Sequence, residues 1–231
     1  MQSENPSEIF NKEHAVSYDK QRAKLAPMRE ALHLLIRMVL SKLPANARIL
    51  CIGVGTGAEL IYLAKAFPQW QFTAVDPAAA MLNICRQQAE EGGFASRCTF
   101  HEGYLDSLPD TSPFDAATSL LVSQFIIEPE QRRKFFSQIA SRLRPGGYLL
   151  NADLAADMSA SSYASLFDIW QRTLTYSGMS VEQVEKFVAF DNIAVLPSQE
   201  VESIIASSGF DAPVLFLQTI LIHAWYAKRA A

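Results

Sequence analysis

The sequence predicts an α/β protein built on a doubly wound, mostly parallel sheet. Three observations support this prediction. An apolar strand at 49–52 leads through a glycine turn into a helical run, and then into a second strand that ends on Asp76. Strand-like and helical stretches alternate from there to residue 152, as expected of successive βαβ units. Two strand-like runs close together in sequence, 214–219 and 221–227, complete the sheet.

Glycine occupies every second position of the turn after the first strand, as Gly53, Gly55 and Gly57. Glycine adopts positive φ without steric cost, so the chain can turn sharply there with its backbone N–H groups exposed to an anionic ligand. A helical run from 59 to 66 follows, and the second strand then places Asp76 at its carboxyl end, where a carboxylate could bind ribose hydroxyls. The alternative is a turn that only packs a helix against a strand.

The same turn also fits a dinucleotide-binding pattern. Gly53, Gly55 and Ala58 match Gly-x-Gly-x-x-Gly/Ala, with Asp76 about twenty residues further on. A dinucleotide dehydrogenase would need a second mononucleotide-binding half, and the chain has too few residues for one. A nicotinamide-dependent dehydrogenase is therefore the less favoured alternative.

Composition narrows the class of protein. The chain has 231 residues, 49% of them apolar, which suits one α/β domain with an insertion, and no apolar segment is long enough to span a membrane. The formal net charge of −4 comes from scattered residues, so nucleic acid is an unlikely partner. Three widely spaced cysteines suggest reduced core thiols, and four histidines without ligand spacing suggest no metal site. The start of the chain lacks a secretory pattern, so we expect a cytoplasmic location.

Two later stretches resemble the class I S-adenosylmethionine-dependent methyltransferases. They are the run 114–121 and the run Leu143-Arg144-Pro145-Gly146-Gly147 that leads into the fifth strand, 148–152. The resemblance covers roughly residues 49–150. It implies a Rossmann-like sheet of seven strands with an antiparallel last strand, and S-adenosyl-L-methionine as cofactor with S-adenosyl-L-homocysteine as product.

The resemblance also implies roles for individual residues. The glycine turn would hold the methionine part of the cofactor, Asp76 the ribose, and the later strand edges the adenine and the methyl group. The cofactor-binding residues that it implies are Tyr18, Arg22, Gly53, Gly55, Gly57, Asp76, Pro77, Met81, Gly103, Tyr104, Leu105 and Leu120. For Met81 the alternative is core packing. Two positions depart from the family, because Cys51 and Tyr104 stand where acidic residues are common.

The N-terminal part of the chain is expected to form a lid, and the C-terminal part is expected to supply the strands that complete the sheet. Residues 1–45 would form an N-terminal helical lid, with Pro27 starting a long helix and Pro77 later standing at a first helical position. In relatives with Tyr-Asp-x-x-Arg ahead of the glycine motif this region covers the cofactor; an ordinary amphipathic helix is the alternative. Residues 46–153 would form the cofactor-binding core, and 200–231 the C-terminal strands.

The molecule that accepts the methyl group is expected to bind beside the fourth strand and the insertion. Gln124 and Phe125 follow that strand. Gln124 would supply a hydrogen-bonding group, and Phe125 would form a wall of the acceptor site. The basic cluster at 132–134 is interpreted mainly as a solvated helix face. Residues 154–199, rich in aromatic residues and methionine, are a helical insertion that we interpret as a substrate cover through Tyr163 and Trp170, or as a homodimer contact or satellite core.

The predicted function is direct SN2 methyl transfer to a small molecule, with positioning more important than a strong base. His14, Asp153 and His223 are possible bases, but none is assigned. One alternative comes from a resemblance to the branch that includes carboxy-S-adenosylmethionine synthase of tRNA modification. That enzyme uses an arginine of its inserted helices, and the matching stretch here, 184–187, has none. A non-catalytic S-adenosylmethionine-binding module is the other alternative.

Overall fold

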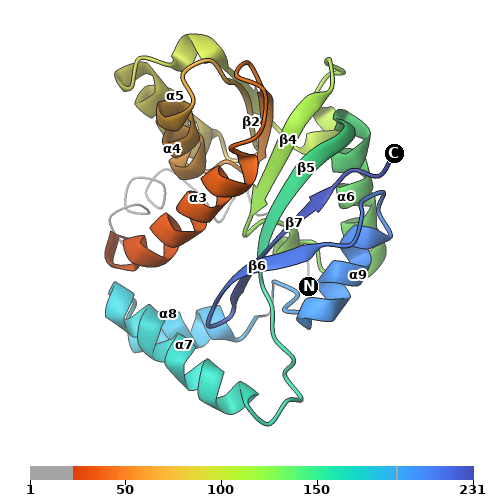
Figure 1. Ribbon diagram of the computed structural model, residues 1–231. Coiled ribbons are helices and arrows are strands. Elements are labelled where there is room, and N and C mark those ends of the chain that lie inside the picture. Colours follow the sequence, from red (N-terminus) through yellow and green to blue (C-terminus); the bar gives the residue numbers. More distant parts are fainter. Residues whose placement is uncertain (1–22, 191) are drawn as a thin grey trace.

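The computed structural model describes residues 23–190 and 192–231, so Tyr18 and Arg22 lie outside the described residues. A seven-stranded sheet runs through it in the order β3-β2-β1-β4-β5-β7-β6 (Figure 1). The strands are β1 Arg48–Ile52, β2 Gln71–Asp76, β3 Cys98–Glu102, β4 Phe114–Leu120, β5 Leu143–Leu154, β6 Val214–Thr219 and β7 Ile222–Lys228. Neighbouring strands are parallel except where β7 pairs with β5 and β6. The predicted fold class is confirmed.

Helices cover both faces of the sheet. The α-helices of the described residues are α3 Ala26–Leu40, α4 Ala58–Ala66, α5 Ala79–Glu91, α6 Pro129–Arg142, α7 Tyr163–Ser177, α8 Val181–Val188 and α9 Ser198–Ala206. One face packs against α3, α4 and α5, and the other against α6 and α9 (Figure 1). Along β1 the alternate residues Ile49 and Cys51 join the first core, and Leu50 and Ile52 join the second. A strand covered on both faces needs a continuous apolar run, which explains why the pattern there does not alternate.

Two element boundaries differ from the prediction. Pro77 precedes α5 by two residues, because the Asp76 carboxylate accepts the N–H of Ala78 at 2.8 Å and forms a local turn before the helix. Strand β5 begins at Leu143 and includes the Pro-Gly-Gly stretch, with a register shift against β4 between Phe114 and Ala116.

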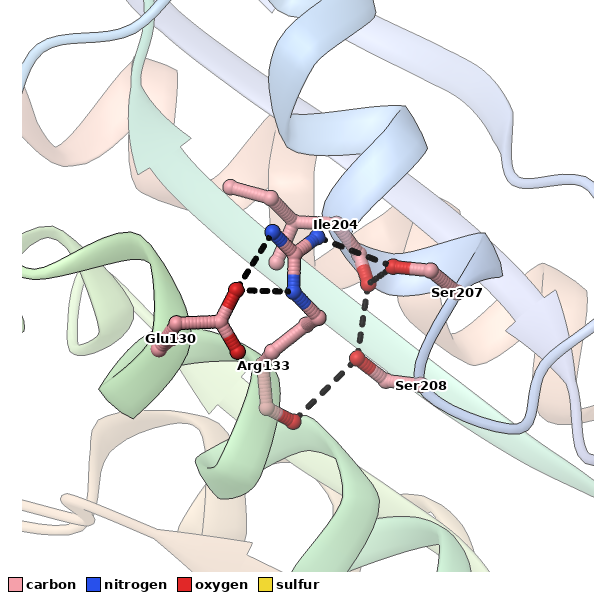
Figure 2. Close-up of polar contacts among 5 residues, drawn as sticks. All are labelled: Glu130, Arg133, Ile204, Ser207 and Ser208. Carbon is pink, nitrogen blue, oxygen red and sulfur yellow. Dashed lines mark hydrogen bonds and ion pairs between the residues drawn. The ribbon is translucent and has the colours of Figure 1, made fainter.

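Helices α6 and α9 are joined by a small polar cluster (Figure 2). Arg133 pairs with Glu130 at 3.0 Å and donates to Ser207 Oγ at 3.3 Å, while Ser208 Oγ donates to the carbonyls of Arg133 at 3.2 Å and Ile204 at 2.7 Å. The exposed ion pair contributes little by itself. The two serine contacts fix the end of α9 over the second core.

The expected solvated face at 132–134 is wrong for Arg132, whose side chain is only 1% exposed. Its guanidinium donates to the carbonyls of Ile126 at 3.1 Å and Ala194 at 3.2 Å. Buried backbone carbonyls need donors, and a long forked side chain can reach two of them at once.

The inserted helices α7 and α8 lie beyond the two layers, near the turn between β6 and β7 (Figure 1). They have a core of their own, in which Trp170, Leu174 and Val184 pack with Leu221 of that turn and Leu154 of β5. None of the helices in the described part of the chain is long and apolar enough to cross a membrane.

Candidate active site

The carboxyl ends of β1, β2, β3 and β4 meet at one edge of the sheet, where the strand order reverses between β1 and β4. Ligands of doubly wound sheets bind outside such a switch point. Three contacts connect the loops there. Gly55 donates its N–H to Asp76 Oδ2 at 2.8 Å, Gly103 donates to the Asp76 carbonyl at 3.1 Å, and the Val122 side chain packs against Gly53. The structure therefore brings the predicted glycine turn, Asp76 and Gly103 together.

The three glycines of the turn differ in what surrounds them. All have positive φ, of 60°, 57° and 89° in sequence order. A Cβ on Gly53 would lie 2.4 Å from Cγ2 of Val122, and one on Gly57 would lie 2.5 Å from Sγ of Cys85. These two glycines allow close packing. A Cβ on Gly55 would meet no described atom within 4 Å, so the turn is open at this position.

The backbone N–H groups of the turn are not the free donors that the sequence suggested. Gly53 and Val54 both donate to the Val75 carbonyl, Gly55 donates to Asp76, and Gly57 donates to the Val54 carbonyl. The first N–H groups of the following helix are also bonded within the protein. The Glu59 carboxyl accepts hydrogen bonds from the N–H groups of Glu59 and Leu60. A pyrophosphate would need several of these donors. The turn is therefore poorly suited to a dinucleotide.

Two buried acids flank the turn instead. Asp76 is 6% exposed and Glu59 is 7% exposed. Burial raises the pKa of Asp76, against hydrogen bonds from Ala78 and Gly55. Burial, with a further contribution from the charge of Asp76, raises the pKa of Glu59 to about 7. Within residues 23–190 and 192–231, neither carboxyl group forms an ion pair.

This pair of acids favours a ligand with hydroxyl donors and positive charge, because buried carboxylates without a basic partner are costly. S-adenosylmethionine fits this requirement through its ribose hydroxyls, its ammonium group and its sulfonium. Glu59 was missed by sequence reasoning. The signal was an acidic residue in the otherwise apolar first turn of the helix that follows the glycines.

The remaining predicted cofactor residues lie near this edge in different environments. Met81 is buried in a small cluster with Ala78, and Leu105 is buried in the second core. Tyr104 is exposed, and Leu120 is half-buried against the first core. Their contacts with a cofactor, like that of Pro77, stay predictions.

The loop after β4 is held by a buried polar network. Leu121 has a φ of 60°, a conformation that is uncommon for a non-glycine residue. Beyond it, Ser123 Oγ and Asn151 Nδ2 donate to Asp153 Oδ2, and the Gln124 N–H donates to Asp153 Oδ1 at 3.0 Å. Burial raises the pKa of Asp153, while the charge of nearby Arg132 opposes this most strongly. Asp153 therefore positions the loop.

The predicted acceptor residues are divided between two places. Gln124 is buried in the loop after β4, and its Oε1 accepts the Leu154 N–H at 2.9 Å, while Phe125 is half-buried beside it. Tyr163 lines a cavity of about 130 Å³ at the start of the insertion. Trp170 is buried in the core of the insertion. The substrate contacts of all four residues stay predictions.

Comparison with known proteins gives a consistent result. Residues 49–147 match the family model of a methyltransferase domain. The carboxy-S-adenosyl-L-methionine synthase of Campylobacter lari is 26% identical over 205 residues, which are 87% of this chain and 86% of that protein.

Two solved structures show the same fold at low sequence identity. An O-methyltransferase family protein from Burkholderia thailandensis has a TM-score of 0.62 at 16% identity, covering 96% of this chain and 64% of its own. A possible exported protein from Bordetella parapertussis has a TM-score of 0.68 at 17% identity, covering 88% of this chain and 68% of its own.

The sheet order, the glycine turn beside Asp76 and the matched domain lead to one assignment. These findings support a class I S-adenosylmethionine-dependent methyltransferase, a family whose members use S-adenosyl-L-methionine as methyl donor.

Proposed function

We propose that the protein transfers the methyl group of S-adenosylmethionine to a small-molecule acceptor by direct SN2 displacement. The observation that supports this most strongly is the open glycine turn flanked by two buried acids, neither of which has a basic partner among residues 23–190 and 192–231. When bound, S-adenosylmethionine supplies an electrophilic methyl group on a sulfonium. The residues around it would act by binding, orientation and exclusion of water.

Each group at this edge of the sheet has a proposed task. Asp76 would accept the ribose hydroxyls, because each of its oxygens retains acceptor capacity beyond the single backbone N–H that it binds. Glu59 would balance the positive charge of the cofactor's ammonium group and sulfonium. The loop after β4, fixed by Asp153, would present Gln124 and Phe125 beside the methyl group, and the inserted helices would cover the acceptor.

Two glycines offer a matched test of the proposed cofactor position. Gly55 and Gly93 both have positive φ, and a Cβ added to either would meet no described atom within 4 Å. Gly55→Ala and Gly93→Ala should therefore cost similar backbone strain, about 1 kcal/mol. Only Gly55→Ala should weaken S-adenosylhomocysteine binding in calorimetry, by about tenfold. Equal affinities for the two variants would contradict the proposed placement.

A ligand panel separates this function from its alternatives. S-adenosylmethionine and S-adenosylhomocysteine should raise the melting temperature, and NAD should not, because only ligands of the native state stabilise it. Catalysis is tested by release of S-adenosylhomocysteine in the presence of small hydroxyl, amine and carboxyl compounds. Cofactor binding without turnover of any compound would favour the non-catalytic module.

A carboxy-S-adenosylmethionine synthase-like activity is the second candidate, supported by the similarity to the Campylobacter lari enzyme over most of both chains. The stretch 184–187 in α8 lacks the arginine expected from that resemblance, so we favour methyl transfer. Tighter binding of the carboxylated cofactor than of S-adenosylmethionine would reverse this order.

Three further features belong to the proposal. We propose a cytoplasmic location and a homodimer. Exposed apolar side chains on and between α7 and α8, such as Ile169, Tyr176 and Val181, support a contact between two copies. We also propose that the chain divides into a lid at 1–45, a cofactor-binding core at 46–153, an insertion at 154–199 and the final strands at 200–231. Light scattering tests the dimer directly.

A further inference from the structure

The loop after β4, residues 121–125, touches the glycine turn on one side and the insertion on the other. Towards the turn, the Val122 side chain packs against Gly53, where an added Cβ would lie 2.4 Å from Cγ2 of Val122. Two residues further along the loop, Gln124 is hydrogen-bonded to both ends of the insertion. The loop therefore connects the proposed cofactor site with the proposed substrate cover.

Gln124 contacts the insertion with its side chain and with its backbone. Its Oε1 accepts the N–H of Leu154, where the insertion begins, at 2.9 Å. Its carbonyl accepts the N–H of Ala194, close to the end of the insertion, at 2.8 Å. Since Gln124 and Leu154 are 5% and 2% exposed, their hydrogen bond is shielded from water. Its loss would leave a buried donor without this acceptor, which is costly.

The two ends of the insertion are also joined to each other. The N–H of Ala156 donates to the Leu196 carbonyl at 2.9 Å, beside a parallel bridge between Ala155 and Leu196. We call residues 154–156 and 194–196 the insertion base. The base is closed by its own backbone and bonded to the loop after β4 on both of its sides.

Two further contacts hold the loop in this position. The Arg132 guanidinium donates to the carbonyl of Ile126, directly after the loop, and to that of Ala194 in the insertion base. At the other end of the loop, Leu121 has a φ of 60°, and its N–H donates to the Ala152 carbonyl at 2.6 Å. Such conformations of non-glycine residues persist where the surrounding structure imposes them, and they cluster at functional sites.

Beyond the base, the insertion is a separately packed unit. Helices α7 and α8 pack around Trp170 and Leu174 in a core of their own (Figure 1). Units of this kind open locally without unfolding of the whole protein. A ligand that holds the glycine turn and Val122 also holds Gln124, so opening of the insertion then has to break bonds to a fixed partner. Coupling between distant sites is carried by such chains of packed side chains and hydrogen bonds.

We propose that Gln124 is a positioning residue, which holds the insertion against the cofactor edge and lets a ligand at the glycine turn slow the opening of the insertion. The inference rests on the proposed function for the identity of that ligand. A cover for the acceptor needs such a fixed placement beside the loop that faces the methyl group.

Hydrogen exchange with and without saturating S-adenosylhomocysteine tests this coupling. In the wild type the ligand should slow exchange in peptides of α7 and α8 at least about fivefold, the lower end of the usual coupling between two sites. Gln124→Met has a similar shape and removes the acceptor of the Leu154 N–H. In this variant the ligand should still protect residues 53–60, but α7 and α8 should exchange as without ligand. Gln199→Met, at an exposed glutamine of α9, is the matched control and should behave as the wild type.

Val122→Ala separates the coupling from a merely structural role of Gln124. This variant keeps the hydrogen bonds of Gln124 and shortens the side chain that packs against Gly53. Without ligand, the insertion base should exchange as in the wild type in Val122→Ala and about tenfold faster in Gln124→Met, as expected for one lost hydrogen bond. With ligand, both variants should lose the protection of α7 and α8. If Gln124→Met fails to fold, Val122→Ala provides the comparison with the wild type.

Three results would overturn the proposal. The first is a wild type in which the ligand protects residues 53–60 but leaves α7 and α8 unchanged. The second is protection of α7 and α8 that persists in Gln124→Met or in Val122→Ala, and the third is its loss in Gln199→Met. Absence of protection at 53–60 in the wild type would overturn the proposed function, and this inference with it.

Discussion

Replacing Glu59 with glutamine should stabilise the protein at pH 8 and have little effect at pH 5. The pKa of this carboxyl is about 7 in the folded protein against an ordinary 4.5. Between these values the unfolded chain releases a proton that the folded protein keeps, so stability falls as the pH rises, and the loss is complete above about pH 7. A pKa difference of about 2.5 corresponds to about 3 kcal/mol. Glutamine has nearly the same shape, keeps an oxygen for the two N–H groups and removes the titration.

Urea unfolding of the ligand-free protein at the two pH values measures this difference. The glutamine variant should be more stable than the wild type by about 3 kcal/mol at pH 8 and by less than about 1 kcal/mol at pH 5. The control is Glu90→Gln, on the exposed face of α5. This variant should have the same stability as the wild type at pH 5 and at pH 8. An equal stability difference at pH 5 and pH 8 would show that Glu59 does not titrate as argued, and would remove one of the two acids from the cofactor argument.

Two further substitutions test the packing around the site. Gly57→Ala should destabilise by about 3 kcal/mol, because its Cβ would lie 2.5 Å from Sγ of Cys85 at a positive φ. In a Cys85→Ala background the same change should cost about 1 kcal/mol, and an unchanged cost in this double-mutant cycle would refute the clash. Arg132→Leu should cost about 3 kcal/mol or more in urea unfolding, since it leaves Asp153 buried without its nearby positive charge. A loss below about 1 kcal/mol would mean that the charge of Arg132 does not compensate Asp153.

The architecture could be predicted because it depends on local patterns. The apolar run of β1, the helical spacing of α4 and the acid that ends β2 each specify one element, and the short link between β6 and β7 specifies a hairpin. Boundaries were less accurate where a side chain competes with the backbone. The Asp76 carboxylate captures the N–H of Ala78 and delays α5 past Pro77.

Much of the site could not be predicted, because it depends on contacts between distant segments. Arg132 looked like part of a solvated cluster, and only the folded position of Ala194 shows that the guanidinium reaches its carbonyl. The N–H groups of Gly53, Val54 and Gly55 looked available to an anion, but their acceptors lie at the end of β2. An acid in an otherwise apolar helical turn was the one local signal for Glu59, but its position beside Asp76 depends on the contact between two distant segments.

The central claim is that S-adenosylmethionine binds at the carboxyl ends of β1 and β2. Hydrogen exchange followed by mass spectrometry, with and without S-adenosylhomocysteine, tests it most directly, because ligand binding protects amides in the segments that it contacts. We predict slower exchange in peptides covering residues 53–60, 76–82 and 103–105, with no change at 93–97. Exchange that is unchanged in all of these peptides at saturating ligand would contradict the account.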